Sequence, residues 1–444
     1  RGGVISVALA CAVLLGFSPR RLAVLGSMGI GLVGTAVLAL LVRAYRPLND
    51  GLLDESAARS QGHRVLFALI VVCGLAFLAR RLVERTTFPR RAADALVPHR
   101  RKIAIAGALL ALAAAAVAAP KIADRVSSFR DPVVFQGNVS TDRIESRLTS
   151  GSANGRYQLW QSSWHAWLAS PVAGRGAGTW EFWWRRHATI NNPSRDSHSL
   201  FFDVLAELGT LGVIALFAMI GSALWFCLLA ARAATGAVRA ALVAIGAGAV
   251  AWTLGAATDW LWEMPAVTVL FVALVALAAS ARRDQAAPAL PEPAPVAAKR
   301  GRAIGGLATA AWIFVVVQAV ALTAAWELQR SETALAQGQS QKAQDAAEVA
   351  RTVEPWAADP YQQLALVRLS FAADAKTVAL ARQAVDREPT NWRTWLVLVR
   401  VEAAAGRLGD ATRQLPVVRR LAKGSALIPT YQNLLDISAG LRDP

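Results

Sequence analysis

Eight apolar runs of near-bilayer length are the feature that most constrains this chain. A helix needs about 20 consecutive apolar residues to cross the hydrocarbon core of a bilayer. The runs occupy residues 2–17, 22–42, 65–79, 103–119, 200–230, 240–258, 265–280 and 303–323. The run at 200–230 is too long for one upright span, so its first part is expected to tilt or to lie along the interface. The pattern predicts an all-α, polytopic helical membrane protein with about eight spans.

The composition agrees with a membrane protein. Of the 444 residues, 55% are hydrophobic and only 17% are charged, which is unlike an ordinary soluble chain. The net charge of +17 would suit a nucleic-acid partner, but the Lys and Arg residues lie mainly between the apolar runs. Basic clusters beside spans mark cytoplasmic loops, so we expect no nucleic-acid partner. Cys11, Cys73 and Cys227 lie inside apolar runs without paired spacing, which favours neither a disulfide framework nor a metal site.

The basic gaps also predict an orientation. Arginines and lysines follow the first run, fill residues 80–102, flank residues 232–239 and fill residues 282–302. With eight spans these four gaps fall on one side, which the positive-inside rule makes cytoplasmic. The segments expected outside are the N-terminus, 43–64, 120–199, 259–264 and everything after residue 325.

The last third of the chain changes character. A Pro- and Ala-rich linker at 284–302 precedes the last run, and from Glu327 the chain is polar and helical. AEVARTVEP ends at Pro355 and ARQAVDREP ends at Pro389, an offset of 34 residues that is typical of tetratricopeptide repeats. Both prolines are expected to end helices. An unrelated array of helical hairpins is the alternative. We therefore predict a membrane domain at 1–323, an external catalytic loop at 120–199 within it, and an external repeat domain at 326–444.

One aromatic and ionisable stretch, from Arg156 to Leu211, carries most of the candidate site residues. Arg156 either snorkels to lipid headgroups or clamps a diphosphate with its planar fork. Trp160 and Trp164 are four residues apart and share a helix face with Trp167. They form an interfacial aromatic belt, guide a lipid chain or stack on sugars, and their spacing does not decide among these roles.

The second half of this stretch adds a glycine-rich turn, a histidine and a glutamate. Gly174-Arg175-Gly176-Ala177-Gly178 lacks the preceding strand and the following Lys-Ser/Thr of a phosphate loop, which favours a tight turn after Pro171. His198 stands where a polar link meets an apolar helix. It is either a structural histidine or a base for an acceptor hydroxyl. Glu207 lies within an apolar run, where a carboxylate is costly unless it is paired or functional.

The ordered combination resembles the O-antigen ligase and polymerase family. It consists of Arg156 with its Trp-rich helix, SPVAGRGAGTWEF, and SHSLFFDVLAELGTLG. Ser199 departs from the family, which has Asn after the His. Arg1-Gly2-Gly3 looks like the family's Ser-Arg-Gly motif at the external end of a span. The chain begins without Met, and we expect an upstream part of the membrane domain to be missing. A C-terminal tetratricopeptide domain also occurs in this family.

The resemblance implies glycan transfer, by ligation or polymerisation, from a polyprenyl diphosphate carrier to an acceptor hydroxyl outside the cytoplasmic membrane. Arg156 and Arg1 would neutralise the departing diphosphate, and His198 would act as general base or orient the acceptor. Substrate binding is assigned to Trp160, Trp164, Gly176 and Glu207. The acceptor would be a glycan, a lipid or a protein, and the repeats would recruit a protein partner. No cofactor or metal is expected. The alternatives are a transporter or flippase of lipid-linked glycans and a non-catalytic scaffold.

Overall fold

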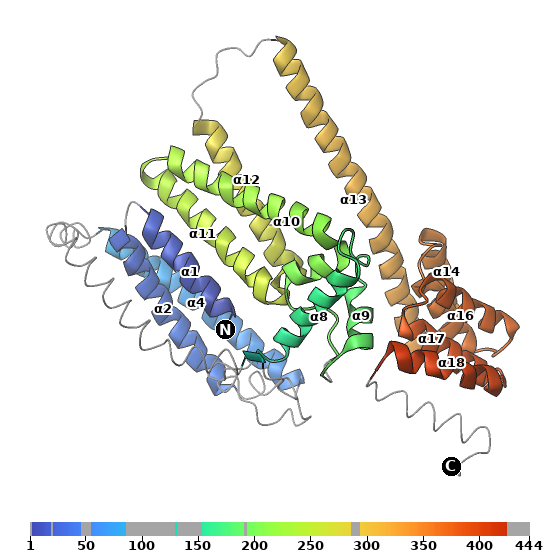
Figure 1. Ribbon diagram of the computed structural model, residues 1–444. Coiled ribbons are helices and arrows are strands. Elements are labelled where there is room, and N and C mark those ends of the chain that lie inside the picture. Colours follow the sequence, from blue (N-terminus) through green and yellow to red (C-terminus); the bar gives the residue numbers. More distant parts are fainter. Residues whose placement is uncertain are drawn as a thin grey trace. The chain divides into compact units, whose positions relative to one another are not determined.

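The structure is a computed structural model that describes residues 2–18, 21–45, 55–85, 129–130, 153–190, 193–285 and 294–423. Every regular element in these residues is a helix (Figure 1), which confirms the predicted all-α class for this part of the chain. The chain divides into two compact units. The first comprises residues 1–180 and 189–287, and the second comprises residues 181–188 and 288–444.

The first unit carries most of the apolar helices and all of the Arg156–Leu211 stretch except residues 181–188. Its helices are α1 (Gly2–Phe17), α2 (Arg21–Ala44), α4 (Glu55–Arg85), α8 (Arg156–Ala169), α10 (Leu200–Ala233), α11 (Gly236–Thr258), the short 3-10 helix η2 (Trp260–Glu263) and α12 (Pro265–Gln285).

Five helical segments among the described residues are long and apolar enough to cross a membrane. They are Ala23–Ala44, Arg59–Leu82, Leu200–Ala233, Gly236–Thr258 and Ala308–Ala336, and Gly2–Phe17 and Pro265–Ala281 are shorter apolar helices. Large apolar side chains such as Leu32, Val33 and Phe67 are exposed on these helices, as expected for surfaces that face lipid. This chain is therefore a multi-pass membrane protein. The predicted run at 103–119 lies outside the described residues, and a total of eight spans stays a prediction.

The core of the first unit lies between α10, α11 and α12. Leu216 and Ile220 of α10 are buried with Trp252 of α11 and Phe271 of α12, and the rings of Trp252 and Phe271 stack with centroids 4.1 Å apart. Fully buried Ala249 and Ala256 allow close approach of the helices, as small residues do in membrane bundles.

The start of α1 lies at the same end of this bundle as the end of α11. A Cβ atom on Gly2 would collide with the side chain of Thr258, so α1 packs closely against α11 at that point. Leu200, at the start of α10, and Trp262 of η2 belong to the same cluster of packed residues. This end of the bundle carries the candidate site.

The opposite end of the first unit is basic. Arg80 of α4 donates to the carbonyl of Ala23 at the start of α2 (2.8 Å). Phe17 lines a common cavity with Arg232 and Arg239, which lie near the junction of α10 and α11. Three of the four predicted basic gaps thus border helix ends that lie away from the candidate site. The assignment of this end to the cytoplasm stays a prediction.

The second unit contains the last apolar helix and a series of helical hairpins. Its helices are α13 (Ala294–Ala336), α14 (Ser340–Val353), α15 (Asp359–Leu369), α16 (Ala375–Arg387), α17 (Trp392–Ala404) and α18 (Leu408–Leu421), and it also holds all but the first residue of α9 (Trp180–His187). Helix α13 runs unbroken from the last apolar segment into the first hairpin. The bounds 1–323 for the membrane domain and 326–444 for the repeat domain stay a prediction.

A 34-residue period is visible in this second unit. Helices α14, α16 and α18 end at Val353, Arg387 and Leu421, each 34 residues after the one before. The first two ends come two residues before Pro355 and Pro389, as predicted, because the residue before a proline is disfavoured in helical conformation. Their assignment to the tetratricopeptide class stays a prediction.

Two tryptophans join the hairpins of this unit. Trp392 is 9% exposed and belongs to a cluster with Leu415 and Val418, and Trp395 packs against both this cluster and the one around Leu364. Core packing is thus the observed role of both rings. The segment 181–188 joins the same unit, because the Glu181 carboxylate accepts two hydrogen bonds from the Arg393 guanidinium, at 2.6 and 3.2 Å.

Candidate active site

A break in α10 organises the backbone around the site. Gly209 has φ 64° and ψ −159°, which interrupts the helix. The break frees the carbonyls of Ala206 and Glu207 and the N–H groups of Thr210 and Leu211 from their usual helical partners. In a bilayer such groups have no water to bond, so each needs another partner.

The turn that follows α8 supplies all four partners. The carbonyls of Pro171 and Val172 accept from the N–H groups of Thr210 (2.8 Å) and Leu211 (3.2 Å). In return, the N–H groups of residues 175 and 176 donate to the carbonyls of Ala206 (3.2 Å) and Glu207 (2.8 Å). The Pro171–Gly176 turn is therefore docked onto the break in α10 by four backbone hydrogen bonds, and the Thr210 hydroxyl adds a fifth bond by donating to the carbonyl of Pro171 (2.8 Å).

Glycines allow this close approach. A Cβ atom on Gly174, whose φ is 69°, would collide with the backbone of Glu207, and one on Gly209 would lie 2.5 Å from the N atom of Gly174. The sequence prediction of a tight turn after Pro171 agrees with this geometry. The Glu207 carboxylate accepts from the backbone N–H of Trp180 (3.1 Å) at the start of α9. Gly176 and Glu207, predicted to bind substrate, thus make contacts that hold the loop in place.

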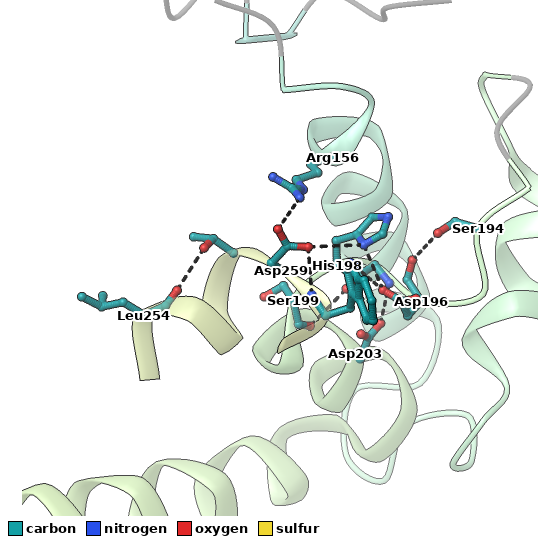
Figure 2. Close-up of polar contacts among 11 residues, drawn as sticks. Arg156, Ser194, Asp196, His198, Ser199, Asp203, Leu254 and Asp259 are labelled. Carbon is teal, nitrogen blue, oxygen red and sulfur yellow. Dashed lines mark hydrogen bonds and ion pairs between the residues drawn. The ribbon is translucent and has the colours of Figure 1, made fainter. Parts of the chain in front are cut away.

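His198 lies in a turn that two carboxylates fix. The backbone N–H of His198 donates to Asp196 Oδ1 (2.7 Å), and that of Ser197 donates to Asp203 Oδ1 (2.9 Å), as Figure 2 shows. His198 itself has φ 57°, in the left-handed region that non-glycine residues seldom adopt. Such strain persists only where surrounding contacts impose it, and it is common at functional sites.

Arg156 and His198 meet at Asp259, a residue that the sequence reading did not single out. Arg156 Nη2 lies 2.8 Å from Asp259 Oδ2, and His198 Nδ1 lies 4.0 Å from Asp259 Oδ1 and 3.4 Å from Asp196 Oδ1 (Figure 2). Arg156 begins α8, whereas Asp259 caps η2 by accepting from the N–H of Trp260. Three segments far apart in sequence thus bring a cation, a carboxylate and an imidazole together.

This cluster is accessible from outside the protein. The side chains of Arg156, His198 and Asp259 are 27%, 29% and 40% exposed. An ion pair with such exposure contributes only about 0–1 kcal/mol. A more highly charged anion can therefore displace Asp259 from Arg156 at small cost.

The predicted aromatic residues have different surroundings. Trp160 stacks on Phe202 of α10, with ring centroids 5.3 Å apart, and also contacts Phe129. Its Nε1 is buried and has no hydrogen-bond partner among the described residues. Trp164 is 47% exposed, and its ring lies 4.6 Å from that of Trp167. Trp160 is thus part of the packing around the site, whereas Trp164 faces outward.

One further carboxyl group, Glu263 of η2, interacts electrostatically with Asp196. Burial raises the pKa of the Glu263 carboxyl, the negative charge of Asp196 raises it further, and Arg195 opposes these effects. Asp259 and Glu263 both fall in the predicted external segment 259–264. The predicted order of spans therefore places Asp259 and Glu263 on the same side of the membrane as Arg156 and His198. This shared external position is the sequence signal that could have identified the two carboxylates.

The remaining predicted residue is Arg1, which lies outside the described residues. Gly2, which follows it, packs against Thr258, the residue before Asp259. No group of three or more His, Cys, Asp or Glu side chains suited to a metal ion occurs in the part of the chain that the structure describes.

A comparison with protein families gives this site a context. Residues 56–217 match the family model described as O-antigen ligase. No curated protein matches the chain. The matched segment contains Arg156, His198 and the Gly174–Gly209 contact, and it ends before Asp259. The match supports the O-antigen ligase family and, with it, a glycosyltransferase-like membrane enzyme of cell-envelope biosynthesis that uses a lipid-linked glycan and a glycan acceptor.

Proposed function

We propose that this chain transfers a glycan from a polyprenyl diphosphate carrier to an acceptor hydroxyl at the outer face of the cytoplasmic membrane. The observation that carries the proposal is the convergence of Arg156 and His198 on Asp259, at one end of a bundle of apolar helices. The match of residues 56–217 to the O-antigen ligase model supports the same reaction class. A site at the end of the spans suits a substrate whose lipid stays in the bilayer while its glycan projects outward.

Arg156 binds the diphosphate in this proposal. Its guanidinium offers a planar fork that matches phosphate oxygens in a bidentate contact. Before the donor arrives, Asp259 holds the guanidinium in place at 2.8 Å. The diphosphate then replaces Asp259, because it carries more charge and the existing pair is partly solvated. We include Arg1 as a second cation, since Gly2 packs beside Thr258.

His198 takes the proton of the acceptor. Its Nδ1 faces the carboxylates of Asp196 and Asp259, which favours a proton on Nδ1 and leaves Nε2 to accept one. The acceptor oxygen attacks the anomeric carbon of the donor sugar as its proton passes to Nε2. The bond from that carbon to the diphosphate oxygen breaks, and the electron pair leaves with the diphosphate. Arg156 stabilises the charge that grows there.

The aromatic residues bind the rest of the donor. The exposed ring of Trp164 suits contact with the polyprenyl chain or a sugar, and Trp160 shapes the adjoining wall through its stack on Phe202. We propose that Gly176 and Glu207 contribute to substrate binding by holding this wall in place. The tetratricopeptide-like hairpins would lie on the same side of the membrane as the loop and recruit the acceptor or a protein partner.

Replacing Arg156 by lysine tests the role of the planar fork. A lysine keeps the charge but forms no bidentate contact. Loss of one charge-assisted hydrogen bond is worth about 1.5–3 kcal/mol. The specificity constant for the lipid-linked donor in proteoliposomes should therefore fall by about 10- to 100-fold.

Arg175→Lys is the matched control for this experiment. Arg175 lies on the same loop, its side chain is exposed, and its backbone N–H donates to the carbonyl of Ala206, a bond that lysine keeps. The control should transfer glycan at the wild-type rate. Equal activity of Arg156→Lys and wild type would mean that Arg156 is an interfacial anchor and not a diphosphate ligand.

A further inference from the structure

A groove with mostly apolar walls opens in the first unit, away from the candidate active site. It has a volume of about 210 Å³ and lies between α1, α10 and α11. Its walls are apolar, with Val13, Leu224, Leu242 and Val250 among them. Its charged residues are Arg232, near the end of α10, and Arg239, near the start of α11. The candidate active site lies by the opposite ends of these two helices.

The dimensions of this groove fit one leaflet of a bilayer. It extends along α11 from Arg239 to Val250, eleven residues apart. At 1.5 Å per residue this is about 16 Å. The hydrocarbon core of a bilayer is about 30 Å thick, so one leaflet contributes about 15 Å. An apolar chain that begins at the arginines would therefore fill the groove down to the middle of the membrane.

The positive charges at the mouth of the groove favour binding of an anion. The residues that line it include two arginines and no carboxylate. Arg239 Nε is buried and has no hydrogen-bond partner among the described residues.

We propose that this groove binds an acidic phospholipid. The phosphate lies between the guanidinium groups of Arg232 and Arg239, and one acyl chain fills the space between α1, α10 and α11. Basic pockets between membrane helices bind anionic headgroups in this way. A zwitterionic lipid brings a cationic headgroup to two arginines and is disfavoured. The site does not depend on the glycan-transfer chemistry proposed above.

Lipid binding to the purified complete protein tests this proposal. Native mass spectrometry would count retained lipid after titration with phosphatidylglycerol or with phosphatidylcholine of the same acyl chains. The wild type should retain phosphatidylglycerol selectively. An arginine near an anionic headgroup contributes about 1 kcal/mol, so the double variant Arg232→Gln/Arg239→Gln should bind phosphatidylglycerol roughly 30-fold more weakly. Arg64→Gln, an exposed arginine of α4 that does not line the groove, should bind it like the wild type.

A second pair of variants tests the apolar part of the site. A Cβ atom on Gly246 would lie 3.6 Å from Cys227 Cβ, an ordinary contact, so leucine at this position extends into the groove. Gly246→Leu should lose phosphatidylglycerol binding, whereas Gly221→Leu, in open space on α10, should keep it. Equal retention of the two lipids, or unchanged binding in the arginine double variant, would contradict the proposal. Inorganic phosphate could also displace the lipid while Gly246→Leu binds phosphatidylglycerol normally. That result would show a phosphate site without an acyl-chain groove, and it would also contradict the proposal.

Discussion

Replacing His198 by alanine should reduce the rate of glycan transfer by about 10²- to 10⁴-fold, the usual contribution of a positioned general base. The imidazole is held by a strained backbone at φ 57° and faces Asp196 and Asp259. Its removal takes away the proton acceptor but leaves the backbone bonds to Asp196 and Asp203 available. The amount of folded protein should therefore stay unchanged. The measurement is the initial rate of glycan transfer in proteoliposomes at saturating donor.

His165→Ala is the matched control for His198→Ala. His165 lies on α8, in the same loop, and its side chain is exposed. The control should retain the wild-type rate. A His198→Ala variant that also transfers glycan normally would show that His198 is a structural residue of the turn and that another group accepts the proton.

Replacing Gly209 by alanine should destabilise the membrane domain by at least about 2 kcal/mol. The residue has a positive φ that alanine seldom adopts, at a cost of about 1–3 kcal/mol. Its Cβ atom would also lie 2.5 Å from Gly174 N and from Val172 O, and overpacking of this kind adds about 1–3 kcal/mol. If α10 instead continued as a regular helix, the docked turn would lose its four backbone partners. Thermal unfolding of the purified protein in nanodiscs measures the effect.

Gly221→Ala separates this effect from a general response to glycine replacement in α10. A Cβ atom on Gly221 meets no other atom within 4 Å, so alanine there should be neutral or slightly stabilising. If Gly209→Ala unfolds at the same temperature as Gly221→Ala, the docked turn and the break in α10 are not needed for stability. Wild-type transfer activity of Gly209→Ala would show that the docked turn and the break in α10 are not needed for catalysis either.

The apolar runs could be predicted from the sequence because membrane spans depend mainly on length and composition. Seven of the eight runs fall in helices of the described residues. The internal break of α10 could not be predicted in this way. The run at 200–230 was expected to tilt or to lie along the interface, because it is too long for one upright span. Gly209 was not identified as the break, because glycine is common within membrane helices. The break depends on contacts with the Pro171–Gly176 turn, more than thirty residues away in the chain.

The site was only partly predictable for a similar reason. Arg156 and His198 stood out because each ionisable group adjoins an aromatic or apolar helix. Asp259 is one of two carboxylates in the short segment between α11 and α12, and its role depends on the packing of α11 against α1 and α10. Gly176 and Glu207 were assigned to substrate, whereas their described contacts join the glycine-rich turn to α10 and to the start of α9. The sequence motif identified Gly176 and Glu207 as residues of the site. Only their contacts distinguish a residue that binds substrate from one that holds the loop in place.

The fate of the carrier in a reconstituted system tests the proposed function most directly. The complete protein would be placed in vesicles with a lipid-linked glycan and a soluble acceptor, and released polyprenyl diphosphate would be counted against new glycosidic bonds. We expect one polyprenyl diphosphate for each bond formed, and neither product with Arg156→Ala/His198→Ala. Movement of intact lipid-linked glycan between leaflets without release of polyprenyl diphosphate would instead identify a transporter and contradict the proposed transfer reaction.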